Sequence, residues 1–291
     1  MHAELQNLIL RAEALVKTNW IHAVNLLEKA AEDHPQEKAV MISLGDIYVR
    51  RQQHRKAIAE YQKALAIDPT DEQLCFLIGN CFFALHEYRL ALSFFDKIKE
   101  SSADVLYNKS LVLAYLGNHT ESIEMIKQTI RIVPDNPFIY FLLIEQLVRT
   151  GRFDEALDFI KKGEEKLGKH KHLTLLKAVV YTKLGIWLMA FAAFMDYEKL
   201  SSIVHADHFH AYGVCAFKIG QFTKAAELLN KALLLEPGVG VYYEDLMRLY
   251  LQQKEYDKAK EIFAMAKQNL RKGSSLLDLL YQRALRESDI D

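Results

Sequence analysis

Five histidines and one aspartate form two groups that could bind a metal ion. They are His170 and His172 in the first group, and His205, His208 and His210 beside Asp207 in the second. Imidazole nitrogens and carboxylate oxygens are ligands for Zn²⁺ and similar cations. Both groups precede or open predicted helices, but their spacing matches no established metal motif. The sequence therefore favours polar residues without a metal, with His172, Asp207, His208 and His210 as the alternative ligands.

No other residues have the spacing of an enzyme site. The sequence contains no phosphate-binding loop, no HExxH motif, no dinucleotide-binding glycine motif and no paired nucleophile and base. Its carboxylates are spread over the outward faces of predicted helices, which is typical of a solvated surface. We therefore predict a protein that is not an enzyme and that needs no cofactor.

Composition and charge narrow the class of partner. The 291 residues include 37 Lys and Arg against 38 Asp and Glu, a formal net charge of -1. Binders of nucleic acid or anionic membranes usually carry a basic excess, so we expect neither partner. No apolar run is long enough to span a membrane, and no signal peptide pattern occurs. Cys75, Cys81 and Cys215 lie in apolar helical stretches and predict buried thiols in the cytoplasm.

A small side chain recurs at nearly constant intervals along the chain. The positions are Ala23, Ala57, Ala91, Ser122, Ala156, Ala190, Ala225 and Ala259. Consecutive positions are 34 residues apart, except for one interval of 31 after Ala91 and one of 35 after Ala190. An aromatic residue or histidine lies three residues before each, and a large apolar residue lies four residues after it. This pattern indicates eight copies of one internal repeat.

Each repeat predicts two amphipathic helices that pack as a hairpin, because its apolar residues recur with a spacing of 3.6. Within residues 38–71, Gly45 lies on the first helix and Ala57 on the second. Both are small because two helices that cross closely leave no room for larger side chains. Tyr48 and Tyr61 are expected to fill the space beside this crossing.

The positions that recur from repeat to repeat resemble the signature of the tetratricopeptide repeat family. In one repeat they are Leu44-Gly45, Tyr48, Ala57, Tyr61, Ala64 and Pro69. The resemblance implies an all-α fold, a right-handed superhelical solenoid with first helices on a concave face and second helices on a convex face. We expect a single solenoid over residues 4–273, with repeats at 4–37, 38–71, 72–102, 103–136, 137–170, 171–205, 206–239 and 240–273. Residues 274–291 are expected to form a C-terminal capping helix and a frayed tail.

The register of the first repeat is uncertain, because Arg11 occupies the position where a small residue is usual. Ile144 and Met247 occupy the same position in two later repeats. The 31-residue repeat lacks three residues near Ser102, and we expect this deletion to alter the superhelix locally.

The family resemblance also implies a partner-binding groove along the first helices of the middle repeats. Its residues would be Phe76, Asn80, Phe83, Tyr107, Asn108, Leu111, Tyr115, Phe138, Phe141, Glu145 and Arg149. Exposed aromatic side chains are favoured anchors for partner chains. The alternatives are that these aromatics pack between repeats, or that the register differs by one residue. Arg149 and Lys183 could add an acidic contact at the groove edge.

Asn80 and Asn108 predict contacts with the backbone of an extended peptide, because a carboxamide donates and accepts at once. In one sub-class of the family, two asparagines at these positions act with basic residues to bind the C-terminal carboxylate of chaperone tails. Here the basic positions hold Phe76, Phe138 and Leu142, so a carboxylate would lack its cations. We therefore expect an apolar or aromatic segment and not a chaperone tail.

The N-terminal helix is apolar on more than one face. The side chains concerned are Leu5, Leu8, Ile9, Leu15 and Val16, together with Leu10 and Ala14. This helix either docks on its own solenoid or contacts a second copy of the chain as a homo-oligomer.

These observations predict a protein-binding scaffold, adaptor or chaperone-like protein that holds an apolar or aromatic client segment in its concave groove. The alternative is a structural subunit of a larger homo- or hetero-oligomeric assembly, which would use the apolar N-terminal helix and the convex surface.

Overall fold

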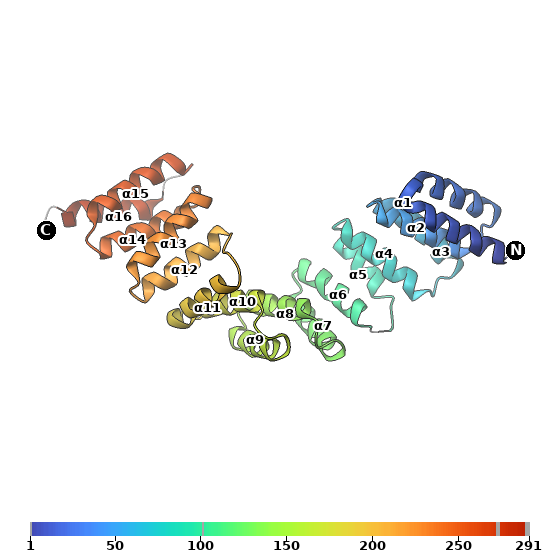
Figure 1. Ribbon diagram of the computed structural model, residues 1–291, viewed down its shortest axis with the longest axis horizontal. Helices are drawn as coiled ribbons and strands as arrows, with labels where there is room; N and C mark the ends of the chain where they lie inside the picture. The colour runs from blue at the N-terminus through green and yellow to red at the C-terminus, as the bar shows by residue number, and fades with distance from the viewer. Residues whose placement is uncertain (1, 101, 272–273, 289–291) are drawn as a thin grey trace. The chain divides into compact units, whose positions relative to one another are not determined.

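The computed structural model describes residues 2–100, 102–271 and 274–288, and all regular structure in these ranges is helical (Figure 1). The helices are α1 (His2–Asp33), α2 (Lys38–Arg50), α3 (His54–Ile67), α4 (Glu72–Ala84), α5 (Tyr88–Phe95), α6 (Ala103–Tyr115), α7 (His119–Ile132), α8 (Pro137–Arg149), α9 (Phe153–Leu167), α10 (Lys171–Lys183), α11 (Trp187–Leu200), α12 (Ala206–Lys218), α13 (Phe222–Leu235), α14 (Gly240–Gln252), α15 (Tyr256–Asn269) and α16 (Ser275–Ser288). The predicted all-α fold is confirmed. The end of the predicted tail, residues 289–291, lies outside the described residues.

The chain divides into two compact units, an N-terminal unit of residues 1–146 and a C-terminal unit of residues 147–291. The N-terminal unit contains the helical hairpins α2–α3, α4–α5 and α6–α7, and the C-terminal unit contains α10–α11, α12–α13 and α14–α15. Within each unit, the second helix of one hairpin packs on the first helix of the next. The helices α2, α4, α6, α8, α10, α12 and α14 begin at residues 38, 72, 103, 137, 171, 206 and 240. The division into eight repeats and the single continuous solenoid stay predictions.

Close helix crossings explain the small residues of each repeat. A methyl group added at Gly45 would overlap the ring of Tyr61, and one added at Gly79 would lie 2.6 Å from Cε1 of Phe95. Tyr61 is fully buried, and its hydroxyl donates to Oδ1 of Asp46 at 2.6 Å. The predicted reason for the small side chains is therefore confirmed at these crossings.

The first hairpin is contained in α1, which has one non-helical residue, Asn19 (φ -149°, ψ 76°). Its side chain accepts from the backbone N–H of His22 at 3.1 Å and so caps the second half of the helix. Arg11 is exposed, whereas Ala12 is fully buried. The small position of this hairpin is therefore Ala12, one residue later than the other repeats suggest, because the turn at Asn19 is shorter than the other hairpin turns.

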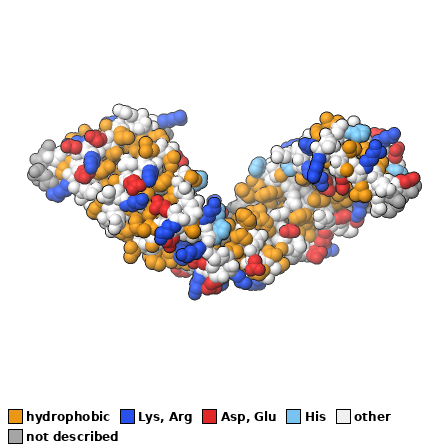
Figure 2. Space-filling model, viewed as in Figure 1, with side chains coloured by type: hydrophobic (Ala, Val, Ile, Leu, Met, Phe, Trp, Pro, Cys, Tyr) orange, Lys and Arg blue, Asp and Glu red, His pale blue; other side chains and the backbone are white. Residues whose placement is uncertain are grey.

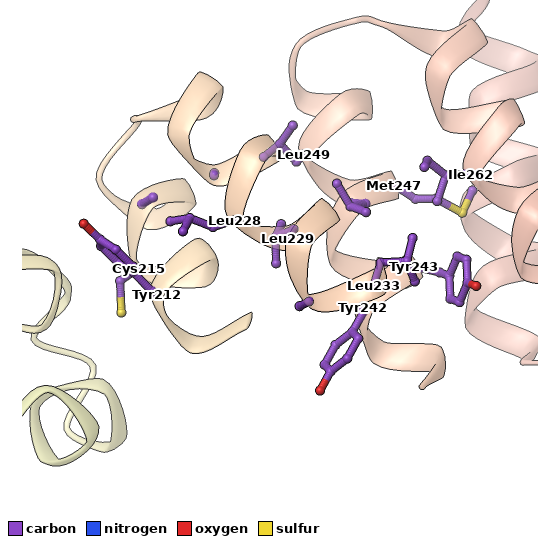
Figure 3. Packing of buried hydrophobic residues seen from close by; sticks show 14 of the residues in the cluster. Tyr212, Cys215, Leu228, Leu229, Leu233, Tyr242, Tyr243, Met247, Leu249 and Ile262 are labelled. Atoms are coloured by element: carbon purple, nitrogen blue, oxygen red, sulfur yellow. The ribbon is translucent and has the colours of Figure 1, made fainter. Parts of the chain in front are cut away.

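Each unit has its own hydrophobic core. In the C-terminal unit, Tyr212 and Leu229 of the hairpin α12–α13 and Tyr243 of α14 are buried (Figure 3). The terminal helix α16 packs on α14 and α15, and the ring of its Tyr281 stacks on Phe263 with centroids 4.2 Å apart. The three cysteines are buried free thiols, and burial raises the pKa of Cys81 to about 11.

Candidate binding surface on α4 and α6

The helices α4 and α6 lie next to one another in the N-terminal unit and share one face. We call this face the α4–α6 surface; it comprises Phe76, Asn80 and Phe83 of α4 with Tyr107, Asn108, Leu111 and Tyr115 of α6. The tyrosine at the end of α6, Tyr115, is 61% exposed, and the other six residues are half-buried. The predicted residues of these two helices are thus brought together, and they form a partly apolar surface that solvent reaches.

The two asparagines form a hydrogen-bonded pair at the centre of the surface. Nδ2 of Asn108 donates to Oδ1 of Asn80 at 2.8 Å. The amino group of Asn80 and the carbonyl oxygen of Asn108 have no protein partner among the residues described. The pair therefore presents one donor and one acceptor, the two groups that a peptide backbone complements.

Three aromatic rings form a cluster at the hairpin-turn end of the same surface. Tyr88 and Tyr115 are stacked, with centroids 4.7 Å apart and planes 5° from parallel. The ring of Phe83 lies 5.7 Å from each of the two tyrosine rings. His86, which has a positive φ of 60°, bonds the Tyr88 hydroxyl through Nδ1 at 2.9 Å. We call Phe83, Tyr88 and Tyr115 the aromatic cluster.

The shortened repeat explains how Tyr115 reaches this cluster. In two repeats the residue that opens the second helix contacts the residue 27 positions later: His119 contacts Gln146, and Tyr88 contacts Tyr115. Gln146 is the tenth residue of its repeat, whereas Tyr115 is the thirteenth, because three residues are missing between Tyr88 and α6. Because of the deletion, Tyr88 contacts a residue that lies about one helical turn further along its helix than Gln146 does. Tyr88 was not among the predicted site residues, and the deletion was the signal that could have found it.

A small pocket adjoins the asparagine pair between α2 and α4. It has a volume of about 220 Å³, and its lining includes Asp46, Val49 and Arg50 of α2 with Leu77 and Asn80 of α4. These α2 residues also belong to the candidate site. The predicted groove residues did not include them, because the first predicted residue, Phe76, lies one repeat later.

Tyr61 supplies the buried wall of that pocket. Burial, assisted by the Asp46 carboxylate that accepts its hydrogen bond, raises the pKa of Tyr61 far above its usual range. The phenol is therefore neutral and holds Asp46 in place at the pocket edge.

The remaining predicted groove residues lie on α8. Phe138 is 66% exposed, and its ring contacts the ring of Phe141 edge to face with centroids 6.0 Å apart. Glu145 is exposed. Arg149 is exposed and belongs to the C-terminal unit, as does the exposed Lys183 of α10. A role for these two cations beside the α4–α6 surface stays a prediction.

The N-terminal helix docks on its own unit. Leu5 and Val16 are only 7% and 5% exposed, and Leu8, Ile9 and Leu15 pack against the same core. Leu5 and Val16 therefore do not face a second copy, which corrects their assignment as oligomer contacts. Both side chains belong to the hydrophobic core of the N-terminal unit.

The four candidate metal ligands are His172, Asp207, His208 and His210. Asp207 accepts a hydrogen bond from the Tyr242 hydroxyl at 2.8 Å, and Nε2 of His210 lies 2.7 Å from Oδ2 of Asp245. Asp207 and His210 are therefore held by protein partners. Within the described ranges, no three His, Cys, Asp or Glu side chains converge as metal ligands. The geometry does not support the metal alternative.

Three family models match parts of the chain. A TPR repeat model matches residues 45–85, and two tetratricopeptide repeat models match residues 103–136 and 216–283. The chain is 30% identical over 133 residues to anaphase-promoting complex subunit 3 of Schizosaccharomyces pombe, covering 45% of this chain and 20% of that protein. It is 22% identical over 156 residues to Superkiller protein 3 of Saccharomyces cerevisiae, covering 50% of this chain and 10% of that protein. The chain thus spans a fifth or less of the length of these relatives.

Solved structures show the same fold. A tetratricopeptide repeat protein from Parabacteroides merdae aligns with a TM-score of 0.58 and 18% identity, covering 84% of this chain and 98% of that one. A chain of the APC/C hetero-tetramer Cut9-Hcn1 aligns with a TM-score of 0.56 and 17% identity, covering 96% of this chain and 55% of that one. Among the residues described here, no helix combines the length and the apolar character needed to cross a membrane.

Proposed function

Because this chain belongs to the tetratricopeptide repeat family, we propose that it is a protein-binding scaffold or adaptor whose α4–α6 surface holds an apolar or aromatic client segment. The observation that carries the proposal is the aromatic cluster beside the asparagine pair. Tyr115 is 61% exposed although it is a large ring, and it is held in one orientation by stacking on Tyr88. A rigid, exposed ring is a good anchor because it loses little freedom on binding.

The client would be recognised in two ways on this surface. An apolar or aromatic side chain would cover Tyr115 and Phe83, and the removal of apolar area from water favours binding by about 25 cal/mol per Å². The client backbone would bond to the free amino group of Asn80 and the free carbonyl of Asn108. Backbone contacts add affinity without reading the sequence, so the aromatic cluster would supply the specificity.

A random dodecapeptide display library, panned on the full chain, supplies probes for this surface. Peptides from it are titrated by calorimetry against the wild type and the variant Tyr115→Ala. Loss of the anchor ring is expected to weaken binding at least about tenfold, which corresponds to about 1.4 kcal/mol. Circular dichroism should be unchanged, because Tyr115 is mostly exposed.

The matched control is Leu234→Ala, which removes an 82% exposed apolar side chain from the C-terminal unit. It is expected to leave the affinity of these peptides unchanged. If every selected peptide binds Tyr115→Ala as tightly as the wild type, the α4–α6 surface is not the binding site.

A second candidate function is that of a subunit in a larger assembly. Leu10 and Ile21 of α1 are 62% and 57% exposed, and large exposed apolar residues often mark contacts between proteins. Similarity to a protein named as a subunit of the anaphase-promoting complex supports this candidate. Light scattering of the wild type and of Leu10→Glu with Ile21→Glu tests for self-association. A strict monomer in both cases would reject the homo-oligomer.

A further inference from the structure

The C-terminal unit has a second recessed surface, which the proposed function does not use. A pocket of about 510 Å³ lies between α9, α10 and α11. This volume is within the range of small-molecule pockets and leaves room for one or two side chains of a partner. Its floor includes the half-buried Tyr181 and the buried Ala193, and Met189, Ala192 and Leu200 line it as exposed side chains. We call it the α9–α11 pocket.

The repeat itself does not require apolar residues at these positions. Met189 and Ala192 lie one residue before and two residues after the small residue of α11. The matching residues of α13 are Lys224 and Glu227, which form an ion pair at 3.5 Å. Those of α15 are Lys258 and Glu261. An apolar pair at this place is therefore a feature of α11, and it continues into the exposed Leu188 and Met195 beside it.

Three lysines surround the apolar floor. Lys177 bonds Glu164 at 3.0 Å and Lys199 bonds Asp196 at 2.8 Å. Within the described part of the chain, Lys169 has no hydrogen-bond or ion-pair partner. The hydrogen bond from Lys199, with the nearby charges of Lys199, Lys169 and Lys177, lowers the pKa of Asp196. All three lysines therefore lie near the Asp196 carboxylate, and they outnumber the two carboxylates of the pocket, Glu164 and Asp196.

The ion pair between Lys199 and Asp196 on this rim is easily exchanged. The side chains of Lys199 and Asp196 are 69% and 58% exposed, and exposed pairs contribute little to stability. A carboxylate arriving from a partner could bond Lys169 and Lys199 at small cost. Figure 2 shows Lys and Arg side chains gathered beside hydrophobic ones over this part of the molecule.

We propose that the α9–α11 pocket is a second protein-binding site, which takes an acidic amphipathic segment of a partner. One or two bulky apolar side chains of the segment occupy the floor over Met189 and Ala192. Flanking Asp or Glu side chains bond the lysine rim, with Lys169 as the first contact. A nucleic acid or a lipid surface is not favoured, because a net charge of about one on the rim is too small for either.

The test uses the full chain and the random dodecapeptide display library. The chain itself supplies the test variant: Met189→Lys with Ala192→Glu copies the residues of α13 onto α11, so it is compatible with a folded hairpin. Peptides retained by the wild type but lost by this variant are expected to carry at least two Asp or Glu with a bulky apolar residue between them. Their affinity, measured by calorimetry, should fall at least about tenfold in the variant and in Lys169→Glu.

Two controls separate this site from the α4–α6 surface. The acidic peptides should bind Tyr115→Ala as tightly as the wild type, and thermal melting should show that the double variant remains folded. Protection from hydrogen exchange on peptide binding should map to α10 and α11. The proposal is overturned if no peptide distinguishes the double variant from the wild type, or if the distinguishing peptides are neutral, basic or sensitive to Tyr115→Ala.

Discussion

His54 and His119 occupy the same place at the start of two second helices, but their hydrogen bonding differs. Nδ1 of His119 bonds Oε1 of Gln146 at 2.8 Å, whereas the buried Nδ1 of His54 has no partner among the described residues. Cys81 stands 27 residues after His54, as Gln146 does after His119. A thiol at this place is too short to serve as the partner.

The substitution Cys81→Gln is therefore expected to stabilise the N-terminal unit. The longer side chain would extend into the pocket that Cys81 and His54 both line and would bond Nδ1. A hydrogen bond to a buried unsatisfied group contributes about 1 kcal/mol. Guanidinium denaturation should show a higher midpoint for Cys81→Gln than for the wild type, and Cys81→Ser, which cannot reach His54, should show no such gain. A lower midpoint for Cys81→Gln would contradict this account.

Gly79 tests the close crossing between α4 and α5. In Gly79→Ala the new methyl group would lie 2.6 Å from the buried ring of Phe95, so the helices must move apart. Overpacking of this kind costs about 1–3 kcal/mol, and the denaturation midpoint should fall accordingly. Gly238→Ala is the control, since its added methyl group meets no atom within 4 Å. Equal midpoints for the two variants would mean that the crossing tolerates a side chain.

At the scale of elements, a charged contact connects the start of α2 with the loop between α3 and α4. Nζ of Lys38 bonds Oδ2 of Asp68 at 2.9 Å and Oδ2 of Asp71 at 2.7 Å. The bonds to Asp71 and Asp68 raise the pKa of Lys38, and the bond from Lys38 lowers the pKa of Asp68. The contact joins the start of α2 to Asp71, the residue that caps the N-terminus of α4.

The contact predicts a pH dependence of stability. Because the pKa of Asp68 is lower in the folded chain, its contribution is complete above the unfolded value of about 4 and is lost as the pH falls through the folded value. Lys38→Met should lower the urea midpoint at pH 7, and its difference from the wild type should shrink as the pH falls toward 3. Lys29→Met, which removes an exposed lysine without this contact, should change little at either pH. A difference that is constant with pH would exclude the ion pair as the cause.

For the whole molecule, the division into two units limits how far a local change spreads. Stability in a repeat protein is a sum of repeat terms and nearest-neighbour contacts. Gly79→Ala should therefore speed hydrogen exchange in α4, α5 and their neighbours in the N-terminal unit, while α12 to α16 keep their wild-type protection. Mass spectrometry of exchanged peptides measures this helix by helix. Equal loss of protection in both units would show that they unfold as one.

Much of this architecture was predictable because it depends on local spacing. The regular spacing of small residues predicted the helical hairpins, and Gly45 and Ala57 predicted a close crossing. The surface of α4 and α6 could also be proposed, because the resemblance to the tetratricopeptide repeat family implies a groove along the first helices of the repeats. The register of α1 could not be predicted. Its turn has one residue fewer than the other hairpin turns, so the buried small residue is Ala12 and the position expected for it holds Arg11.

The amino-acid sequence by itself determined the repeat, the hairpins and the faces of their helices, because these depend on residues within one or two turns of each other. Tertiary structure decided which side chains meet across helices. It paired Asn80 with Asn108, stacked Tyr115 on Tyr88, buried Leu5 and Val16, and gathered Lys169, Lys177 and Lys199 around an apolar floor. Such contacts join separate helices, so they depend on how the helices cross and on a three-residue deletion that shifts one partner by a turn.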